Sequence, residues 1–193
     1  MSLCNNINVQ PTPIGPGDGS NAYDAFGRLR VSNPLTIFDS KNVMSKNTLF
    51  DEALTGSGTV TYTANKSTVN LNVTTVSGDK VIRQSKRVMS YQPGKSLLIL
   101  NTFVMNTQEE NLEQRVGTFD ANNGIFFEDT GTAYQIVRRT YVTGSAVDND
   151  VAQSSWNGDK LDGTGASGYT LDPTKATIMF TDYEWLGMGA VTI

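Results

Sequence analysis

Apolar and polar residues alternate along much of the chain after residue 56, and a period of two marks half-buried β-strands. Turns rich in Asn, Asp, Gly and Ser separate these segments, and the clearest is Asp120–Gly124. Residues 35–38 are interpreted as a short strand, and residues 49–54 as either a helical turn or a short edge strand. The alternation predicts further strands near residues 60–64, 69–75, 80–89, 113–119, 124–129, 132–142, 177–185 and 190–193.

The longest unbroken apolar run is Leu97–Leu100, inside a predicted strand over Ser96–Met105. Such a run is typical of a strand covered on both faces, so we expect it among the central strands of an antiparallel sheet. No helical period extends over ten residues, and no internal repeat is visible. Eight or nine short strands at this spacing predict an all-β fold, an antiparallel β-sandwich or jelly roll.

Residues 1–34 differ from the rest, because prolines alternate with glycines between positions 11 and 19. Proline removes backbone donors and glycine raises chain entropy, so this segment is not expected to form its own core. Two interpretations stay open: a disordered leader, or an extended arm that becomes ordered on a neighbouring subunit. The arm is favoured by apolar and forked cationic side chains that suit anchoring. These are Phe26, Arg28, Leu29, Arg30 and Val31.

A long insertion, Thr143–Asp172, is rich in Gly, Ser, Asp and Asn. Loops of this length are usually functional or disordered. Four of its aspartates suggest calcium, but their spacing fits no calcium loop and no glutamate closes the set, so a solvated acidic loop is preferred. They are Asp148, Asp150, Asp159 and Asp162. Trp156 either folds back onto the sheet, which is favoured, or offers a stacking surface for sugars together with Tyr169.

Composition excludes several classes of function. The net charge of −4, with 18% charged residues, argues against binding nucleic acid through a basic surface. No segment approaches the roughly 20 apolar residues that span a bilayer, and the N-terminus lacks the apolar run of a secretory signal. The chain has no histidine and one cysteine, which removes His-based nucleophile systems, the usual zinc sites and an internal disulfide. These observations exclude several kinds of enzyme, and we expect no enzyme, no cofactor and no metal site.

Other chemical motifs are incomplete. Pro93–Ser96 looks like the end of a phosphate-binding loop, but Met89 stands where the first glycine belongs and a strand follows instead of a helix. Two acidic pairs suit a glycosidase only with a groove that the sequence cannot demonstrate. They are Glu128 with Asp129, and Asp182 with Glu184. The clusters Arg138-Arg139 and Arg83/Lys86/Arg87 are interpreted as solvated faces or intersubunit ion pairs.

Several segments together resemble a family of virion structural proteins from tailed bacteriophages, many of them marine. The segments are Asp24–Ser32, Tyr91–Ser96, Gln114–Phe119, Asn123–Glu128 and Asp182–Gly187. The resemblance implies a short N-terminal arm, residues 1–34, and a lectin-like, concanavalin-like β-sandwich over residues 35–193. In that family the last segment leads into further strands, so we expect the sandwich to be truncated at its C-terminus.

The resemblance implies a structural component of the virion: a head decoration, a fibre or a tail part. Such a protein would form homo-oligomers and contact other virion proteins through its arm. The alternative hypothesis is a carbohydrate-binding adhesin that contacts host-surface glycan through Trp156 and Tyr169. A glycosidase that uses Asp182 and Glu184 ranks last. No hypothesis involves nucleic acid or a membrane.

Overall fold

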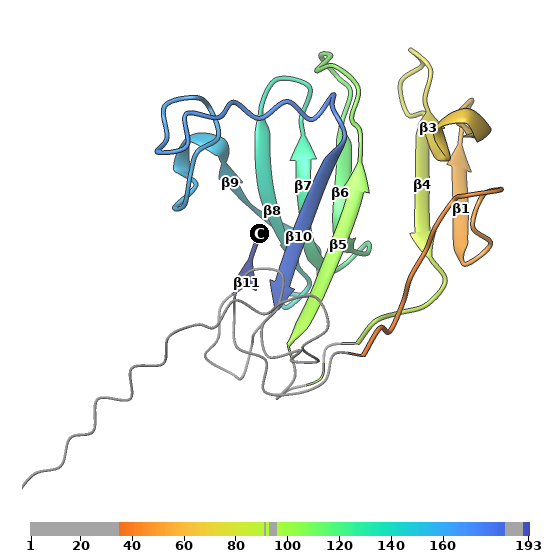
Figure 1. Ribbon diagram of the computed structural model, residues 1–193, viewed down its shortest axis with the longest axis horizontal. Coiled ribbons are helices and arrows are strands. Elements are labelled where there is room, and N and C mark those ends of the chain that lie inside the picture. The colour runs from red at the N-terminus through yellow and green to blue at the C-terminus, as the bar shows by residue number, and fades with distance from the viewer. Residues whose placement is uncertain (1–34, 91, 93–95, 184–190) are drawn as a thin grey trace, which may run out of the picture. The chain divides into compact units, whose positions relative to one another are not determined.

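The computed structural model describes residues 35–90, 92, 96–183 and 191–193 (Figure 1). The predicted arm, with all five of its anchoring candidates, lies outside the described residues. Contacts divide the chain into two compact units, residues 1–89 and 90–193, which are described one by one. The described residues hold eleven strands and two single-turn 3₁₀ helices, and all strand pairs are antiparallel. The predicted all-β class is confirmed, while one sandwich over residues 35–193 stays a prediction.

The first unit contains two separate strand pairs. The outer pair in sequence is β1 (Phe50–Thr55) with β4 (Lys80–Ser85), and between them β2 (Thr59–Thr63) and β3 (Thr68–Asn72) form a hairpin. The one-turn helix η1 (Ala64–Lys66) makes the hairpin reversal, and Ser67 follows it in the left-handed region. Residues 49–54, interpreted as either a helical turn or an edge strand, are mostly strand, because β1 begins at Phe50. The short strand predicted at 35–38 was wrong, because that stretch has no regular structure.

The second unit contains a three-stranded and a four-stranded sheet. In order across the sheets, the strands are β11 (Val191–Thr192), β10 (Thr177–Tyr183) and β5 (Leu97–Phe103), then β6 (Gln114–Phe119), β7 (Gly124–Asp129), β8 (Tyr134–Thr140) and β9 (Val147–Ala152). Figure 1 shows the β5–β10 pair in front of the other sheet, and the rings of Phe103 and Phe127 meet between them at 6.2 Å. This layering is consistent with a β-sandwich.

The most buried strand is β7, between β6 and β8. Because successive strand residues point to opposite faces, Phe127 and Asp129 face the other sheet while Phe126 and Glu128 face outward. All four are buried. The apolar run predicted to be central instead belongs to β5, which among the described residues lies at one end of its sheet.

The insertion at 143–172 is only partly a loop. Residues Val147–Ala152 form β9, which pairs with β8 along its length, and the 3₁₀ turn η2 (Gln153–Ser155) follows. The interpretation of this part as loop was wrong because aspartates at alternate positions hid the strand. Asp148 stands opposite Arg139 and forms an ion pair with it, whereas the sequence suggested that this aspartate was solvated.

Candidate functional site

The two carboxylates at the end of β7 are both buried, and both are held by hydrogen bonds. Glu128 accepts hydrogen bonds from Arg115 and from the Gln135 amide. Asp129, on the opposite face, accepts from Gln108, Gln114 and the backbone N–H of Gly131, at 2.9, 3.2 and 2.9 Å. A glycosidase needs two carboxyl groups facing one substrate. These two face away from each other, so the geometry gives them a structural role.

An aromatic ring on the outer face of the four-stranded sheet lies beside two guanidinium groups. Phe126 is fully buried, with the guanidinium carbons of Arg115 and Arg139 at 5.5 and 5.2 Å from its ring centroid. Arg139 also donates two hydrogen bonds to Asp148, each 2.7 Å long. These bonds hold the pKa of the Asp148 carboxyl below its usual range. Arginine stems cover apolar surface while their charged ends stay paired.

Glycine and phenylalanine alternate across the β6–β7 hairpin. Gly117 stands opposite Phe126, and Gly124 stands opposite Phe119. A Cβ added at Gly117 would come within 2.5 Å of the Ile125 carbonyl oxygen, so only glycine fits without a backbone shift. The two rings meet at 4.4 Å between centroids. Packing therefore accounts for the glycines and phenylalanines of this hairpin, whose sequence also contributes to the family resemblance.

Aspartates organise the rest of the insertion as local acceptors. Asp159 accepts hydrogen bonds from the backbone N–H groups of Leu161 and Ser167, at 2.8 and 2.7 Å, and the Ser167 bond comes first among the causes that lower its pKa. Asp162 accepts from the N–H and hydroxyl of Thr164. Each carboxylate therefore serves its own turn. Within the described ranges, no group of three or more acidic, histidine or cysteine side chains is placed to share a metal ion.

The two candidate glycan contacts, Trp156 and Tyr169, differ in burial. Trp156 is half-buried, and its indole N–H donates to the Val151 carbonyl oxygen of β9 at 3.1 Å. It folds back onto the strand that precedes it, as the sequence favoured. Tyr169 is exposed, and no ring contact joins it to Trp156 in the part of the chain that the structure describes. The geometry does not bring the two rings together as one stacking surface.

Two other candidate sites from the sequence lie partly outside the described residues. Asp182 is buried at the end of β10, while Glu184, its proposed partner in catalysis, lies outside the described residues. The same holds for residues 93–95 of the phosphate-loop-like segment. The chain that follows them is strand β5, so the helix that a phosphate loop requires is not there.

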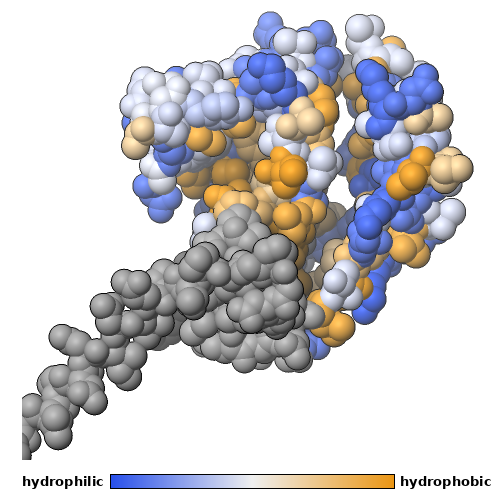
Figure 2. All heavy atoms as spheres, viewed as in Figure 1, coloured by the Kyte–Doolittle hydropathy of each residue, from blue (hydrophilic) through white to orange (hydrophobic). Residues whose placement is uncertain are grey.

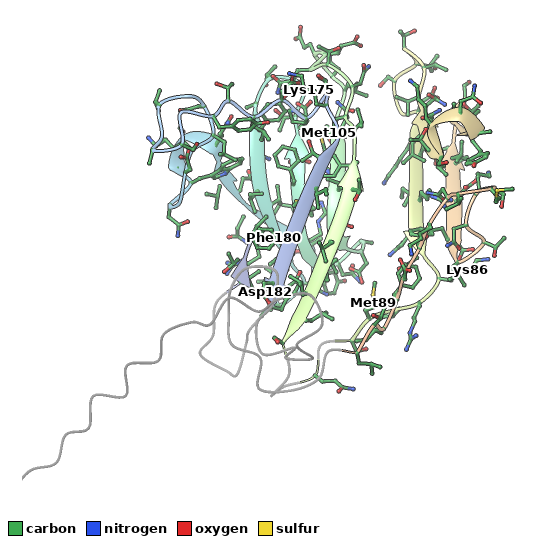
Figure 3. The ribbon with its side chains drawn as sticks, viewed as in Figure 1. Lys86, Met89, Met105, Lys175, Phe180 and Asp182 are labelled. Carbon is green, nitrogen blue, oxygen red and sulfur yellow. The ribbon has the colours of Figure 1, made fainter. Side chains whose placement is uncertain are left out.

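The outer face of the β5–β10 pair is mainly apolar, although Thr102 and Asp182 also belong to it. Phe103, Asn101 and Ile99 face the other sheet, so the alternate residues of β5 face outward, and the register places those of β10 beside them. Figure 2 shows hydrophobic residues gathered over this pair, and Figure 3 shows Phe180 midway along it, between Met105 and Lys175 at one end and Asp182 at the other. Its exposed large apolar residues are Leu98 (39%), Leu100 (60%) and Ile178 (67%), together with Val104 (59%) directly after β5. We call these four residues the apolar face.

Sequence reasoning missed the apolar face because the run Leu97–Leu100 predicts a strand buried on both sides. The run Ile178-Met179-Phe180 on β10 likewise shows no alternation that would mark an exposed face. No helix among the described residues is long and apolar enough to cross a membrane. Comparison of the chain with protein families, with curated proteins and with solved structures finds no match in any of the three.

Proposed function

We propose that this chain is a structural protein of a bacteriophage virion, either a head decoration, a fibre or a tail component. It assembles with further copies of itself. The observation that carries the proposal is the apolar face, where side chains as large as Leu100 and Ile178 stay mostly exposed on a well-formed sheet. Contiguous exposed apolar surface marks interaction sites more than it marks catalytic ones.

The chemistry of the described residues supports an assembly role. The buried carboxylates of β7 and the aspartates of the insertion are engaged in bonds that maintain the fold. The partner that we assign to the apolar face is a second copy of this chain, because a homo-oligomer contact needs no further component and symmetric assembly is the usual arrangement. Residues 1–34 then anchor the protein through Phe26, Arg28, Leu29, Arg30 and Val31, in accordance with the family resemblance.

The test is the absolute mass in solution, by light scattering, of the full chain and of two variants. The full chain should form a defined oligomer, and Leu100→Glu with Ile178→Glu should shift it toward monomer because two buried charges would oppose association. Val142→Glu is the matched control, since Val142 is 90% exposed and lies after β8, outside the apolar face. A monomeric full chain, or a double variant with unchanged mass, would contradict self-assembly through this face.

The arm is tested separately by Arg28→Ala with Arg30→Ala and by deletion of residues 1–34. Both variants should keep the circular dichroism spectrum of the sheets and lose incorporation into particles. Arginine supplies forked donors that alanine lacks, whereas the described strands involve neither residue. Incorporation at the level of the unchanged protein would show that the anchoring role is wrong.

A further inference from the structure

A pocket of about 320 Å³ lies in the second unit, beside the first turn after β9. It is lined by Gln108, Thr132, Ala133, Tyr134, Ala152, Gln153 and Ser154. These residues come from three places in the chain: the β5–β6 connection, the start of β8, and the junction of β9 with η2. Its volume is at the lower end of the range for small-molecule sites, roughly 300–1,000 Å³.

The orientation of two glutamine amides in this pocket follows from their partners. The Gln108 amide nitrogen donates to Asp129 Oδ1 at 2.9 Å, and the Gln153 amide nitrogen donates to the Leu161 carbonyl oxygen at 3.0 Å. A carboxylate and a carbonyl can only accept, so the NH₂ groups must face them. Each amide oxygen therefore points away from its anchor. Both residues are half-buried, which fixes these acceptors in place.

Tyr134 supplies the third anchored polar group. Its ring stacks on Phe127, with centroids 5.6 Å apart and planes 29° apart, so the ring is supported from the core side. Burial, followed by the charges of Asp129 and Asp172, raises the pKa of the Tyr134 hydroxyl. A tyrosine hydroxyl can donate as well as accept a hydrogen bond. Thr132 and Ser154 add exposed hydroxyls at the rim.

The lining carries no charged side chain. An anionic ligand would find no opposite charge there, and Asp129 behind Gln108 would repel it. Acceptor oxygens and hydroxyl groups fixed beside an aromatic ring fit a ligand that presents several hydroxyl donors and an apolar C–H face. Neutral pyranose sugars have this chemistry.

We propose that this pocket binds one neutral sugar unit of a glycan, through the amide oxygens of Gln108 and Gln153 and the hydroxyl of Tyr134. This site is separate from Trp156 and Tyr169, and it stands or falls independently of the virion role. It places the contact where three segments distant in sequence meet, which explains why no local motif indicated it.

The experiment is saturation-transfer difference NMR on the full chain with single sugars as probes. The neutral set is glucose, galactose, mannose and N-acetylglucosamine, and the charged set is glucuronate and N-acetylneuraminate. At least one neutral sugar should bind, with a dissociation constant on the order of millimolar, as suits a site with few contacts. The charged sugars should bind at least tenfold more weakly. Absence of signal from every neutral sugar, or preference for a charged one, would overturn the proposal.

Paired variants locate the binding. Ala133→Trp should fill the pocket and weaken binding at least tenfold, whereas Ala146→Trp adds the same ring at an exposed position that does not line it. Tyr134→Phe keeps the stack on Phe127 but removes the hydroxyl, and it should weaken binding about three- to tenfold. Tyr141→Phe and Tyr169→Phe should leave binding within twofold.

Thermal melts verify that each variant folds. If Ala133→Trp does not fold, the binding measured with Tyr134→Phe decides whether the pocket is the site. Binding that survives both pocket variants would refute the assignment. So would binding that is lost only in Tyr169→Phe, because the contact would then lie on the exposed loop.

Discussion

The two sheets of the second unit differ in how they treat their outer faces. On the four-stranded sheet, Phe126 is fully buried because arginine side chains from both neighbouring strands lie over its ring. On the three-stranded sheet, Leu100 and Ile178 have no such cover among the described residues and stay 60% and 67% exposed. Long cationic side chains that are paired with acids can complete an outer face within one chain. The apolar face lacks such arginines among the described residues, and this contrast supports the proposed self-assembly.

The largest effect on stability should come from truncating Phe126, the ring that the two arginines cover. Phe126→Ala should lower the free energy of unfolding by about 3–5 kcal/mol, because it removes a fully buried ring and leaves a cavity under two arginines. Urea denaturation followed by tryptophan fluorescence measures it, since both tryptophans lie in the second unit. A loss below about 1 kcal/mol would mean that the ring is not buried, on the scale of core truncations.

A smaller loss of stability is expected from adding a methyl group at Gly117, which stands opposite Phe126. Gly117→Ala should destabilise the second unit by about 1–3 kcal/mol, because the added methyl group meets the Ile125 carbonyl oxygen at 2.5 Å. The comparison variant is Gly144→Ala, where no atom lies within 4 Å of the added Cβ but the positive φ also disfavours alanine. The excess of the first loss over the second isolates the packing clash. Equal losses would remove the clash from the explanation.

The Arg139–Asp148 pair should contribute about 1 kcal/mol, because it is bidentate but partly solvated. A double-mutant cycle with Arg139→Gln and Asp148→Asn measures the coupling at pH 7 and at pH 3. The pKa of Asp148 is lowered by folding, so its stabilisation is present above the unfolded value, about 3.9, and is lost as pH falls through the folded value. Coupling that persists undiminished below the folded pKa would contradict the ion pair.

The smallest effect on stability should come from the apolar face. Leu100→Ser with Ile178→Ser should change the free energy of unfolding of the monomer by no more than about 0.5 kcal/mol, since exposed side chains contribute little to the fold. The same variant should lose self-association in sedimentation velocity at high concentration. A loss comparable to that of Phe126→Ala would show that the face is covered within the chain, and the contrast between the sheets would fail.

Strand positions were largely predictable because a half-buried strand leaves its alternation in the sequence. The hairpin of β6 and β7 lies within the predicted segments, and Asp120 accounts for the turn by accepting from the backbone N–H groups of Asn122 and Asn123. Strand β9 was missed because its alternation pairs valine with aspartate, and hydropathy alone cannot show that Asp148 has an arginine beside it.

The candidate sites were less predictable, for a different reason. Trp156 is a single conspicuous residue, and its fold-back onto Val151 follows from local chemistry. The pocket unites Gln108, Tyr134 and Gln153, which are ordinary residues until the fold brings their segments together. The direction of each amide depends on an acceptor elsewhere in the chain. Such a site has no spacing rule that a sequence could display.

The hydrogen bonds of Asp159 have a consequence for how this protein can change. They close the loop around residues 161–167, and the bridge between Asp162 and Thr170 closes it again nearby. The tip at residues 163–168 therefore keeps its shape without help from either sheet. Foreign peptides grafted at that tip should leave the strands in register, since exposed loop tips tolerate insertion best. The same independence would let this tip diversify rapidly under selection while the sheets stay unaltered.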